Sequence, residues 1–413
     1  MLLSTRTKIG WLAAWSFLFC LFIPSLIYAQ DFSLNGTLRG YYFSSTRDLD
    51  EETDIFGSSF QPRGTLKFAP YLTLYAEMRF IAAKPWKDVY SSLREAYADV
   101  YLESLDFRIG KQIIQWGRAD SINPTDNLTP WNYTLLFSDD SDLRSGVVAL
   151  RSNYYYKNIA FTGIWIPFFE PNRFPLPPNY QVTEETPSET LGNSQYAFKI
   201  DSTIGILDWS LSYFDGFDPM PDLSLSTSGI ILKYPRIRVI GGDFATTLGK
   251  FGIRGEAAYF FTEDMDGNNP EKKNPYLFYV LGVDRTIWEN LYLNLQFIER
   301  VVINYKNPMD IQNPYLRDVA VKGAIINNQL DRITNAISLK IGYKMFNETL
   351  NLELSNIYNI TRRDYLIRPK ITYAFTDHLS GIVGADIYEG KENTLFGLFE
   401  DNTTFFAEIK YGF

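Results

Sequence analysis

The sequence predicts an all-β protein, a single transmembrane antiparallel β-barrel of about 18 strands. Three observations predict this fold class. Apolar and polar residues alternate along most of the chain, the alternating segments are long, and short turns alternate with longer polar connections. Aromatic residues are also abundant, at 16% of the chain, which suits a barrel that places rings in girdles at both membrane interfaces.

The alternation is clear in the segments Tyr71–Phe80, Leu207–Tyr213 and Leu350–Ser355, where apolar side chains share one face and mostly polar ones the other. A soluble β-sandwich would alternate as well. The segments, however, run to roughly 10–14 residues, enough for a tilted membrane crossing, whereas soluble strands average about half that length. After residue 30 no apolar run approaches about 18 residues, which excludes helical membrane spans.

Short turns fix the parity of the strands. Treating Asp218–Pro235 as one outer loop or extended hairpin gives eight turns and nine longer loops, and hence 18 strands with both termini on the periplasmic side. Counts of 16 or 20 stay open because strand boundaries are hard to place from sequence. The predicted turns are Ala69–Pro70, Ser104–Leu105, Lys157–Asn158, Gly205–Ile206, Gly249–Lys250, Trp288–Asn290, Phe346–Glu348 and Asp377–His378.

Residues 1–29 have the pattern of a cleaved export signal. Arg6 and Lys8 supply the basic start, Ile9–Ile27 is almost wholly apolar, and Ala29 is a small residue at the cleavage position. A retained transmembrane helix is the alternative. With the signal removed, residues 30–413 are predicted to form one barrel domain in the outer membrane of a Gram-negative cell.

Charge and cysteine content exclude several classes of function. The net charge of −9 becomes −11 once Arg6 and Lys8 are removed, which disfavours nucleic acid as a partner. Cys20, the one cysteine, lies in the export signal, so the mature fold uses neither a disulfide nor a thiolate.

Residues for enzyme or metal chemistry are scarce. His378, the one histidine, lies beside Asp377 in a predicted turn, which indicates a turn residue rather than a general base. No His/Cys metal cluster is possible, and we expect no metal or cofactor. Asp139, Asp140 and Asp142 form an acidic loop tip that would either be solvated or hold Ca²⁺ weakly.

If the apolar face of each strand meets lipid, the polar face lines the lumen. Charges on that face either set solute selectivity or pair with one another and stiffen the wall, and the sequence leaves both readings open. The predicted pore-lining residues are Glu77, Arg79, Glu95, Asp99, Arg108, Gln112, Asp243, Arg254, Glu256, Lys340, Glu353, Arg368 and Lys370, with Glu408 and Lys410 on the last strand.

The predicted strand Phe107–Trp116 and the following loop, Gly117–Asp142, contain glycines inside the strand pattern. Gly110 and Gly117 indicate a bend or the close approach of another segment. The loop is either an ordinary outer loop or one that folds inward and narrows the pore. Folding inward would place four predicted constriction residues near the narrowest point: Arg118, Asp120, Asn123 and Asp126.

The run R-x-G-K-Q-x-x-x-W-G, from Arg108 to Gly117, resembles an early barrel signature of porin-like outer-membrane families, including alginate-export-type channels and uncharacterised relatives. The match covers about 25 residues and is architectural elsewhere. The resemblance implies a monomeric barrel with a conduit from periplasm to surface. The chain departs from the alginate-export pattern at Asn123–Asn127, and its predicted inward acids are as frequent as its bases, which does not suit a polyanion.

The last strand carries an independent signal. Thr403, Phe405, Ala407 and Ile409 share one face with Tyr411 and the terminal Phe413. This arrangement resembles the C-terminal signal by which the barrel assembly machinery recognises outer-membrane barrels, so Tyr411 and Phe413 are the predicted assembly residues.

We therefore expect a non-enzymatic, porin-like channel in the outer-membrane lipid for passive passage of small hydrophilic solutes, with weak cation preference. A barrel-anchored surface-binding protein is the first alternative, with Pro167–Leu191 and Asn304–Leu330 as binding loops. An export conduit for a cell-surface polymer is the second.

Overall fold

The computed structural model describes residues 31–45, 54–68, 70–83, 89–120, 122–175, 182–226 and 229–413. The predicted export signal, residues 1–29, lies outside these described residues.

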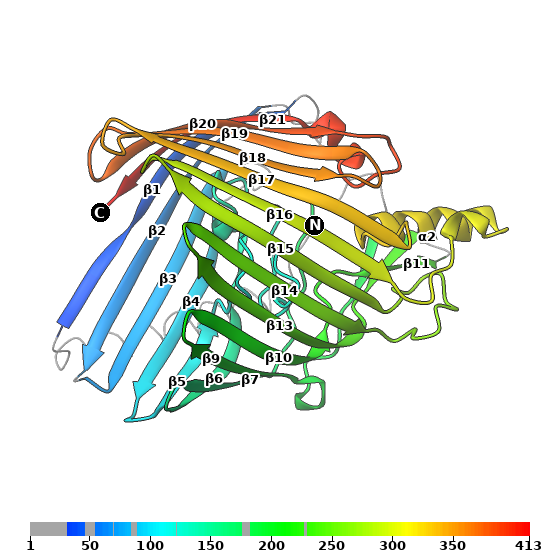
Figure 1. The fold of residues 1–413 in the computed structure, drawn as a ribbon, viewed down its shortest axis with the longest axis horizontal. Coiled ribbons are helices and arrows are strands. Elements are labelled where there is room, and N and C mark those ends of the chain that lie inside the picture. Colours follow the sequence, from blue (N-terminus) through cyan, green and yellow to red (C-terminus); the bar gives the residue numbers. More distant parts are fainter. Residues whose placement is uncertain are drawn as a thin grey trace.

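Eighteen strands of the described residues form one antiparallel barrel (Figure 1), which confirms the predicted fold class and strand count. β1 pairs with β2 on one side and with β21 on the other, and these two pairings close the sheet. The barrel strands are β1 (Asp31–Ser45), β2 (Asp54–Phe68), β3 (Leu72–Ala83), β4 (Tyr90–Tyr101), β5 (Leu105–Gln112), β6 (Val147–Tyr156), β7 (Ile159–Ile166), β9 (Gln195–Ile204), β10 (Leu207–Phe217), β13 (Arg236–Leu248), β14 (Phe251–Phe261), β15 (Tyr276–Ile287), β16 (Leu291–Val302), β17 (Ile333–Met345), β18 (Leu350–Asn359), β19 (Asp364–Ala374), β20 (Leu379–Glu389) and β21 (Thr404–Gly412).

All eight predicted turns join consecutive strands at one end of the barrel, here called the turn end, although Ala69 itself is outside the described residues. Gly205 and Gly249 adopt φ values of 62° and 63°, which tight hairpins need and glycine reaches without strain. The opposite end, with the longer connections, is called the loop end.

One of the nine connections predicted to be longer than the turns is in fact a tight turn. Only residues 360–363 separate β18 from β19. The Asn359 side-chain oxygen accepts a hydrogen bond from the Arg362 backbone N–H at 3.2 Å, and Arg363 takes a φ of 61°. Asparagine caps such turns through its own side chain, so a short polar connection is stable here.

The connection Asp218–Pro235 contains the predicted hairpin, formed by β11 (Asp222–Ser226) and β12 (Gly229–Lys233). β8 (Val182–Glu185) adds to β12 in parallel, so two distant loops share one small sheet. Helix α2 (Pro314–Ile326) packs on β11, and projects sideways at the loop end in Figure 1. Leu223, Leu232 and Val319 form the buried core of this outer-loop unit. No helix of the described residues is long and apolar enough to cross a membrane.

Short 3₁₀ helices complete the connections. They are η1 (Asp140–Leu143), η2 (Leu191–Asn193), η3 (Pro308–Asp310) and η4 (Gly397–Asn402).

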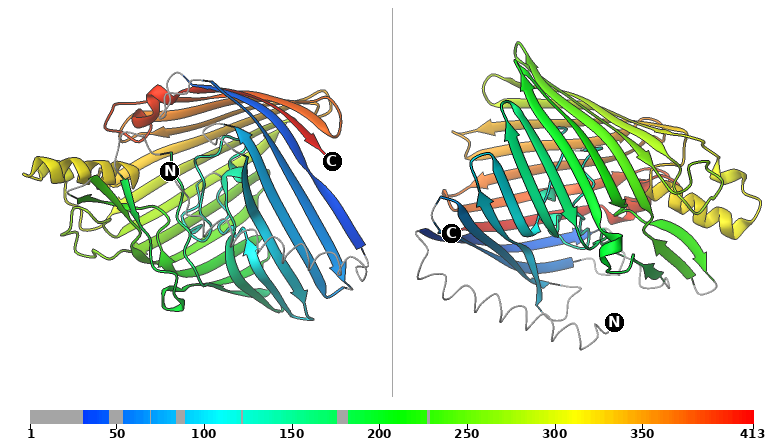
Figure 2. Two further views of the ribbon diagram at one scale, coloured as in Figure 1. Left: turned by 180° about the vertical axis from the view of Figure 1, so that it is seen from behind. Right: turned by 90° about the horizontal axis from the view of Figure 1, so that it is seen from below.

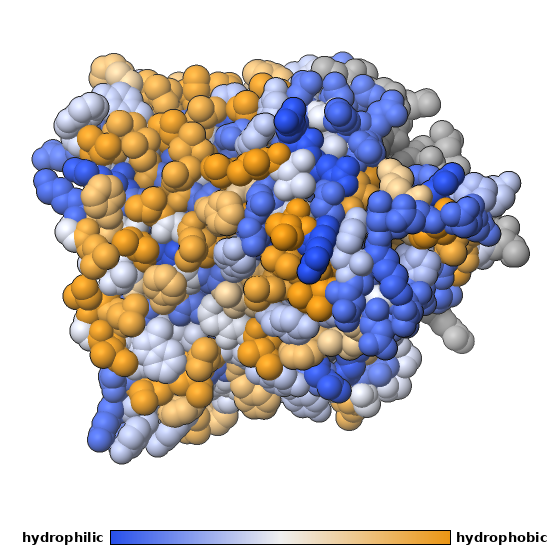
Figure 3. Space-filling view, turned by 45° about the vertical axis from the view of Figure 1, so that its right-hand side comes forward, coloured by the Kyte–Doolittle hydropathy of each residue, from blue (hydrophilic) through white to orange (hydrophobic). Residues whose placement is uncertain are grey.

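The outward face of the strands is apolar, as the alternation predicted. Leu211, Ile240, Leu281 and Ile409 are each more than half exposed. Figure 3 shows the result: an orange, apolar zone covers the strands, and a blue, polar zone covers the loops to its right.

The predicted strand Phe107–Trp116 is too long, because β5 ends at Gln112 and the chain then turns into the barrel. Side chains accept hydrogen bonds from the backbone N–H groups that no longer pair with a neighbouring strand. Glu95 accepts from the Ile113 N–H at 2.7 Å, and the Thr129 hydroxyl accepts from the Ile114 N–H at 2.9 Å. Gly110, with φ 130°, lies so close to the β4 backbone that a Cβ there would overlap the Ala96 carbonyl oxygen, as its glycine led us to expect.

Candidate functional site

The connection between β5 and β6, residues 113–146, lies inside the barrel and is here called the inner loop. In the left view of Figure 2 its teal trace runs through the interior, between the walls. Its described residues contact opposite walls through two lobes. The first lobe, residues 114–128, meets the wall from β6 to β16, and the second lobe, residues 135–143, meets the wall from β19 through β21 and β1 to β3.

Apolar side chains attach both lobes. In the first lobe, Ile114, Trp116 and Leu128 join a buried cluster with inward side chains of β6, β7, β9, β10, β13, β14 and β15. In the second, Leu135 and Phe137 join a buried cluster on β1, β3, β20 and β21. Burying a large apolar side chain stabilises by about 1.5–3 kcal/mol, so the inner loop is a packed element.

These inward apolar patches differ from the sequence-based prediction, in which the apolar residues of each strand face lipid. A signal was present: the segments 257–261 (AAYFF) and 276–281 (YLFYVL) do not alternate. Continuous apolar runs indicate strands that are buried on both faces.

Glu256 of β14 holds the first lobe by its backbone. Its carboxylate accepts hydrogen bonds from the N–H groups of Arg118 at 3.0 Å, Ala119 at 3.2 Å and Thr125 at 2.7 Å. The Thr125 hydroxyl adds a fourth at 2.8 Å. Glu256 is only 3% exposed, so these donors replace the water that an ionised carboxylate needs. A Cβ at Gly117 would overlap this carboxylate.

Ion pairs reinforce the first lobe. Arg118 binds Asp243 of β13 and also Asp201 of β9, the latter at 3.3 Å. Asp120 binds Arg254 of β14 and accepts a hydrogen bond from the Asn294 amide of β16 at 2.6 Å.

The acidic tip predicted from the sequence, Asp139 with Asp140 and Asp142, belongs to the second lobe. Its carboxylates bind basic side chains of the wall. Asp139 lies 3.3 Å from Lys370 and 3.6 Å from Lys410. Asp140 lies 2.6 Å from Arg368. These carboxylates are thus neutralised by the wall across the lumen, rather than left as a solvated tip.

The same tip continues to β1 and β3. Asp142 pairs with Arg39 at 2.7 Å, and its backbone carbonyl accepts from Arg79 at 2.6 Å. Ser138 donates to Glu408 at 3.0 Å.

Asp126 does not reach the wall. It pairs with Arg144 within the inner loop and accepts from the Trp116 N–H at 3.3 Å, so it ties the first lobe to the end of the inner loop that leads into β6. The Asn123 amide donates to the Ala119 carbonyl at 2.8 Å, inside the first lobe.

The predicted pore-lining set therefore divides into two groups. One group contacts the inner loop directly: Arg79, Glu95, Asp243, Arg254, Glu256, Arg368 and Lys370. The other binds the wall itself: Glu77 with Arg94, Asp99 with Arg108, Gln112 with the Ala149 carbonyl, and Lys340 with Glu353. Three further wall residues contact the inner loop but were not in the predicted set: Arg39, Asp201 and Asn294. Apolar and polar residues alternate in their strands, so this signal was available.

Between the two lobes, the wall from β14 to β19 carries the more exposed charges. The exposed fraction of the side chain is 32% for Arg254 and 38% for Lys340, and it is 60% for Asp140 on the facing lobe. Lys340 and Asn294 are register partners on adjacent strands, and Asn294 and Arg254 both bind Asp120, so Arg254 and Lys340 belong to one region of the wall. This arrangement can contact a polar solute from two sides.

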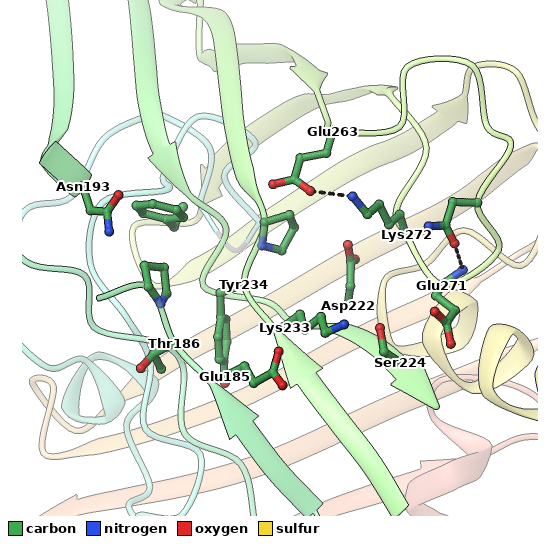
Figure 4. Close-up of a pocket in the computed structure, with 14 residues that line it drawn as sticks. Glu185, Thr186, Asn193, Asp222, Ser224, Lys233, Tyr234, Glu263, Glu271 and Lys272 are labelled. Atoms are coloured by element: carbon green, nitrogen blue, oxygen red, sulfur yellow. Dashed lines mark hydrogen bonds and ion pairs between the residues drawn. The ribbon is translucent and has the colours of Figure 1, made fainter. Parts of the chain in front are cut away.

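A separate pocket of about 500 Å³ lies at the loop end, between the outer-loop unit and the rim of the barrel at β10 and β14 (Figure 4). Phe217, Tyr234 and two prolines line it, together with two lysines and four carboxylates. Glu263 and Lys272 pair at 2.8 Å. Its charge is mixed, with acids in excess.

Predicted site residues at the turn end lie apart from the inner loop. His378 is in the turn between β19 and β20, and its ring lies 6.4 Å from that of Tyr411. Phe413 stacks on Phe60 with 5.9 Å between the ring centres, and it exchanges backbone hydrogen bonds with Gly36 at 3.0 and 3.1 Å.

Comparison with known proteins gives a fold and no family. No protein-family model matches the sequence, and no curated protein matches it significantly. Among solved structures, the chain is similar to the outer membrane protein OpdK from Pseudomonas aeruginosa, with a TM-score of 0.58 and 10% identity, over 94% of this chain and 100% of that one.

OccAB1 from Acinetobacter baumannii gives a TM-score of 0.59 at 7% identity, over 94% of this chain and 97% of that one. OpdK has also been solved with vanillate, and that structure gives 0.57 at 10% identity over 94% and 99%. These likenesses support the predicted porin-like barrel and lend no support to an alginate-export-type channel.

Proposed function

We propose that this protein is a porin-like channel of the Gram-negative outer membrane, through which small hydrophilic solutes pass without covalent chemistry. The inner loop is the observation that carries the proposal. A loop that packs on both inner walls narrows a barrel of 18 strands to the space between its lobes. The solved structures of similar fold include two of the outer membrane protein OpdK, one of them with vanillate.

Selectivity in this proposal comes from the exposed charges between the lobes. Each of Arg254, Lys340 and Asp140 makes an ion pair, but its side chain stays about one third exposed or more, so solutes can still reach it. Charged groups that line a narrow passage screen solutes by their field. With both signs present and a net charge of −9 for the whole chain, we expect weak cation preference.

Planar-bilayer recording of the purified, folded barrel tests this function. We expect single-channel steps and a reversal potential, under a KCl gradient, that indicates slight cation preference. A folded barrel that gives no conductance would disprove the channel, and a clear anion preference would disprove the selectivity.

The role of the inner loop has its own test, the substitution Glu256→Gln. A glutamine side chain of the same size presents an N–H₂ group to the loop's N–H donors, and each lost charge-assisted bond costs about 1.5–3 kcal/mol. We expect the first lobe to detach and conductance to rise with more noise. Glu353→Gln is the matched control, because Glu353 is inward but binds Lys340 and Lys370 rather than the loop. If both variants have the same conductance, the inner loop does not narrow the channel.

The proposal extends to the route of the protein into the membrane. We propose that residues 1–29 are removed on export, that Tyr411 and Phe413 are read by the barrel assembly machinery, and that the barrel functions as a monomer. The docking of Phe413 on Phe60 and Gly36 supports a role for this residue in closing the barrel.

A surface-binding function is the second candidate, and the outer-loop unit favours it. The two predicted binding loops meet there, one through β8 and the other through α2. Replacing residues 308–326, which hold η3 and α2, with a short linker would abolish binding to cells or surfaces and leave conductance unchanged. Loss of solute flux without loss of binding would favour the channel alone.

A further inference from the structure

The outward face of the barrel carries two arginines near the loop end, where the apolar zone of the strands gives way to polar side chains. Arg236 and Arg238 of β13 alternate with inward residues, on the same side of the strand as Ile240, which is 53% exposed. Asp215 of β10 is the register partner of Arg238 and shares its face with Leu211, which is 57% exposed. This group therefore faces the membrane side of the wall and not the lumen.

The height of the group in the membrane follows from its neighbours. Ile240, the next outward residue of β13 toward the turn end, has Tyr213 and Tyr259 as register partners. Outward tyrosines mark the boundary between hydrocarbon and headgroups. One outward step along a strand is roughly 7 Å, so Arg238 lies beyond this boundary, at the level of the headgroups on the loop side.

The arginines carry more positive charge than their partner neutralises. Nε of Arg236 lies 2.6 Å from one oxygen of Asp215, and Nε of Arg238 lies 3.4 Å from the other. One carboxylate thus serves two guanidinium groups. The Arg238 side chain is 67% exposed, and its terminal nitrogens have no partner in the part of the chain that the structure describes.

The nearest other charges do not cancel this excess. Glu263 accepts a hydrogen bond from the Arg236 backbone N–H at 3.2 Å, but its other oxygen already binds Lys272 at 2.8 Å. The group of Asp215, Arg236, Arg238, Glu263 and Lys272 therefore has a net charge of +1. Arg236 is also held over the Phe217 ring, 5.3 Å from its centre, which fixes its direction.

We propose that Arg236 and Arg238, here called the arginine pair, bind the phosphate of a lipid headgroup in the outer leaflet. A guanidinium presents paired N–H donors that match phosphate oxygens, and it remains charged at any pH of the cell. The site is on the lipid side of the wall, at headgroup height, which favours a lipid over a soluble phosphate. The inference is independent of whether the barrel conducts, but it rests on the proposed outer-membrane location.

The adjacent pocket is a worse place for the phosphate. Its four carboxylates are Glu185, Asp222, Glu263 and Glu271, against Lys233 and Lys272. An anion entering the pocket would meet more negative than positive charge, whereas at the arginine pair it meets the opposite. The phosphate therefore binds at the arginine pair on the outer surface and not in the pocket.

Native mass spectrometry of the purified barrel, titrated with phosphorylated lipid A in detergent, tests the site. We expect a bound lipid whose affinity falls at least tenfold in the double variant Arg236→Gln/Arg238→Gln. The matched control is Arg285→Gln, which removes an outward arginine at the turn end that stacks on Phe251. Its affinity should equal that of the unchanged protein.

Two further probes fix the chemistry and the source of the anion. Dephosphorylated lipid A should bind the unchanged protein at least tenfold more weakly than the phosphorylated form, a comparison that holds even if the double variant does not fold. Inorganic phosphate at equal concentration should not displace the lipid. Equal binding of the two lipid forms, undiminished binding by the folded double variant, or displacement by inorganic phosphate would each overturn the proposal. Conductance of the double variant should be unchanged.

Discussion

At the scale of the residue, the contact between Gly117 and Glu256 shows how the lobes are positioned. Glu256 is buried in the wall and binds three N–H groups that a turn of the inner loop directs toward it. The turn can approach so closely because Gly117, with φ 89°, has no Cβ. The sequence identified both residues, Gly117 as a point of close approach and Glu256 as inward, but it gave no reason to connect them.

This contact predicts the effect of Gly117→Ala. The added Cβ overlaps the Glu256 carboxylate, and alanine at this positive φ is strained by about 1–3 kcal/mol. We expect a larger, noisier conductance and faster proteolysis of the inner loop. Gly64→Ala on β2 is the control, since a Cβ there meets no atom within 4 Å. If the two variants behave alike, the close approach at Gly117 does not matter.

At the scale of the element, the outer-loop unit depends on one buried lysine. Lys273 lies 2.9 Å from Asp218 and 3.5 Å from Asp222, and its ammonium also donates to the side chain of Asn327, which follows α2, at 3.3 Å. Three separate connections are thus joined at one point. Burial, helped by the charge of Asp218 and opposed by Lys273, raises the pKa of Asp222 to about 6.

The raised pKa of Asp222 predicts a pH dependence with a definite sign. In the unfolded chain this carboxyl has a pKa near 3.8, so between that value and about 6 the folded unit binds more protons than the unfolded one. Its contribution to stability is complete below this window and is lost as the pH rises through 6. We expect larger protection factors against hydrogen exchange, corrected for the intrinsic pH dependence of the exchange rate, in residues 218–226 at pH 5 than at pH 7.5. Asp222→Asn should remove the difference, and an increase in protection with rising pH would contradict the prediction.

At the scale of the whole molecule, closure depends on the seam between β1 and β21. Nine register pairs join these strands, from Thr37–Gly412 to Ser45–Thr404. Phe413 extends the seam by two backbone hydrogen bonds to Gly36 and by its stack on Phe60 of β2. A Cβ at Gly36 would meet the Phe413 ring, so glycine leaves the space in which the ring lies.

The seam predicts that Phe413→Ala weakens the barrel at closure. Phe413 as a whole residue is 41% exposed, so the loss should be below the roughly 3–5 kcal/mol of a fully buried phenylalanine. We expect a smaller fraction of folded barrel after refolding into detergent, measured by heat-dependent gel mobility. Phe346→Ala, at an exposed turn, is the control. An equal folded fraction for the two variants would contradict a role of Phe413 in closure.

The sequence by itself indicated about 18 strands, the eight turns and the inward position of many charged side chains, such as Arg254 and Glu256 of β14. These features are local: a period of two residues and the glycines of tight turns suffice to specify them. Only the tertiary structure decided that the inner loop folds inward and packs on both walls of the barrel. That result depends on pairs such as Asp140–Arg368 and Thr125–Glu256, whose members are more than a hundred residues apart. No local pattern records such partners, because ion pairs and packing require closeness in space and not in sequence.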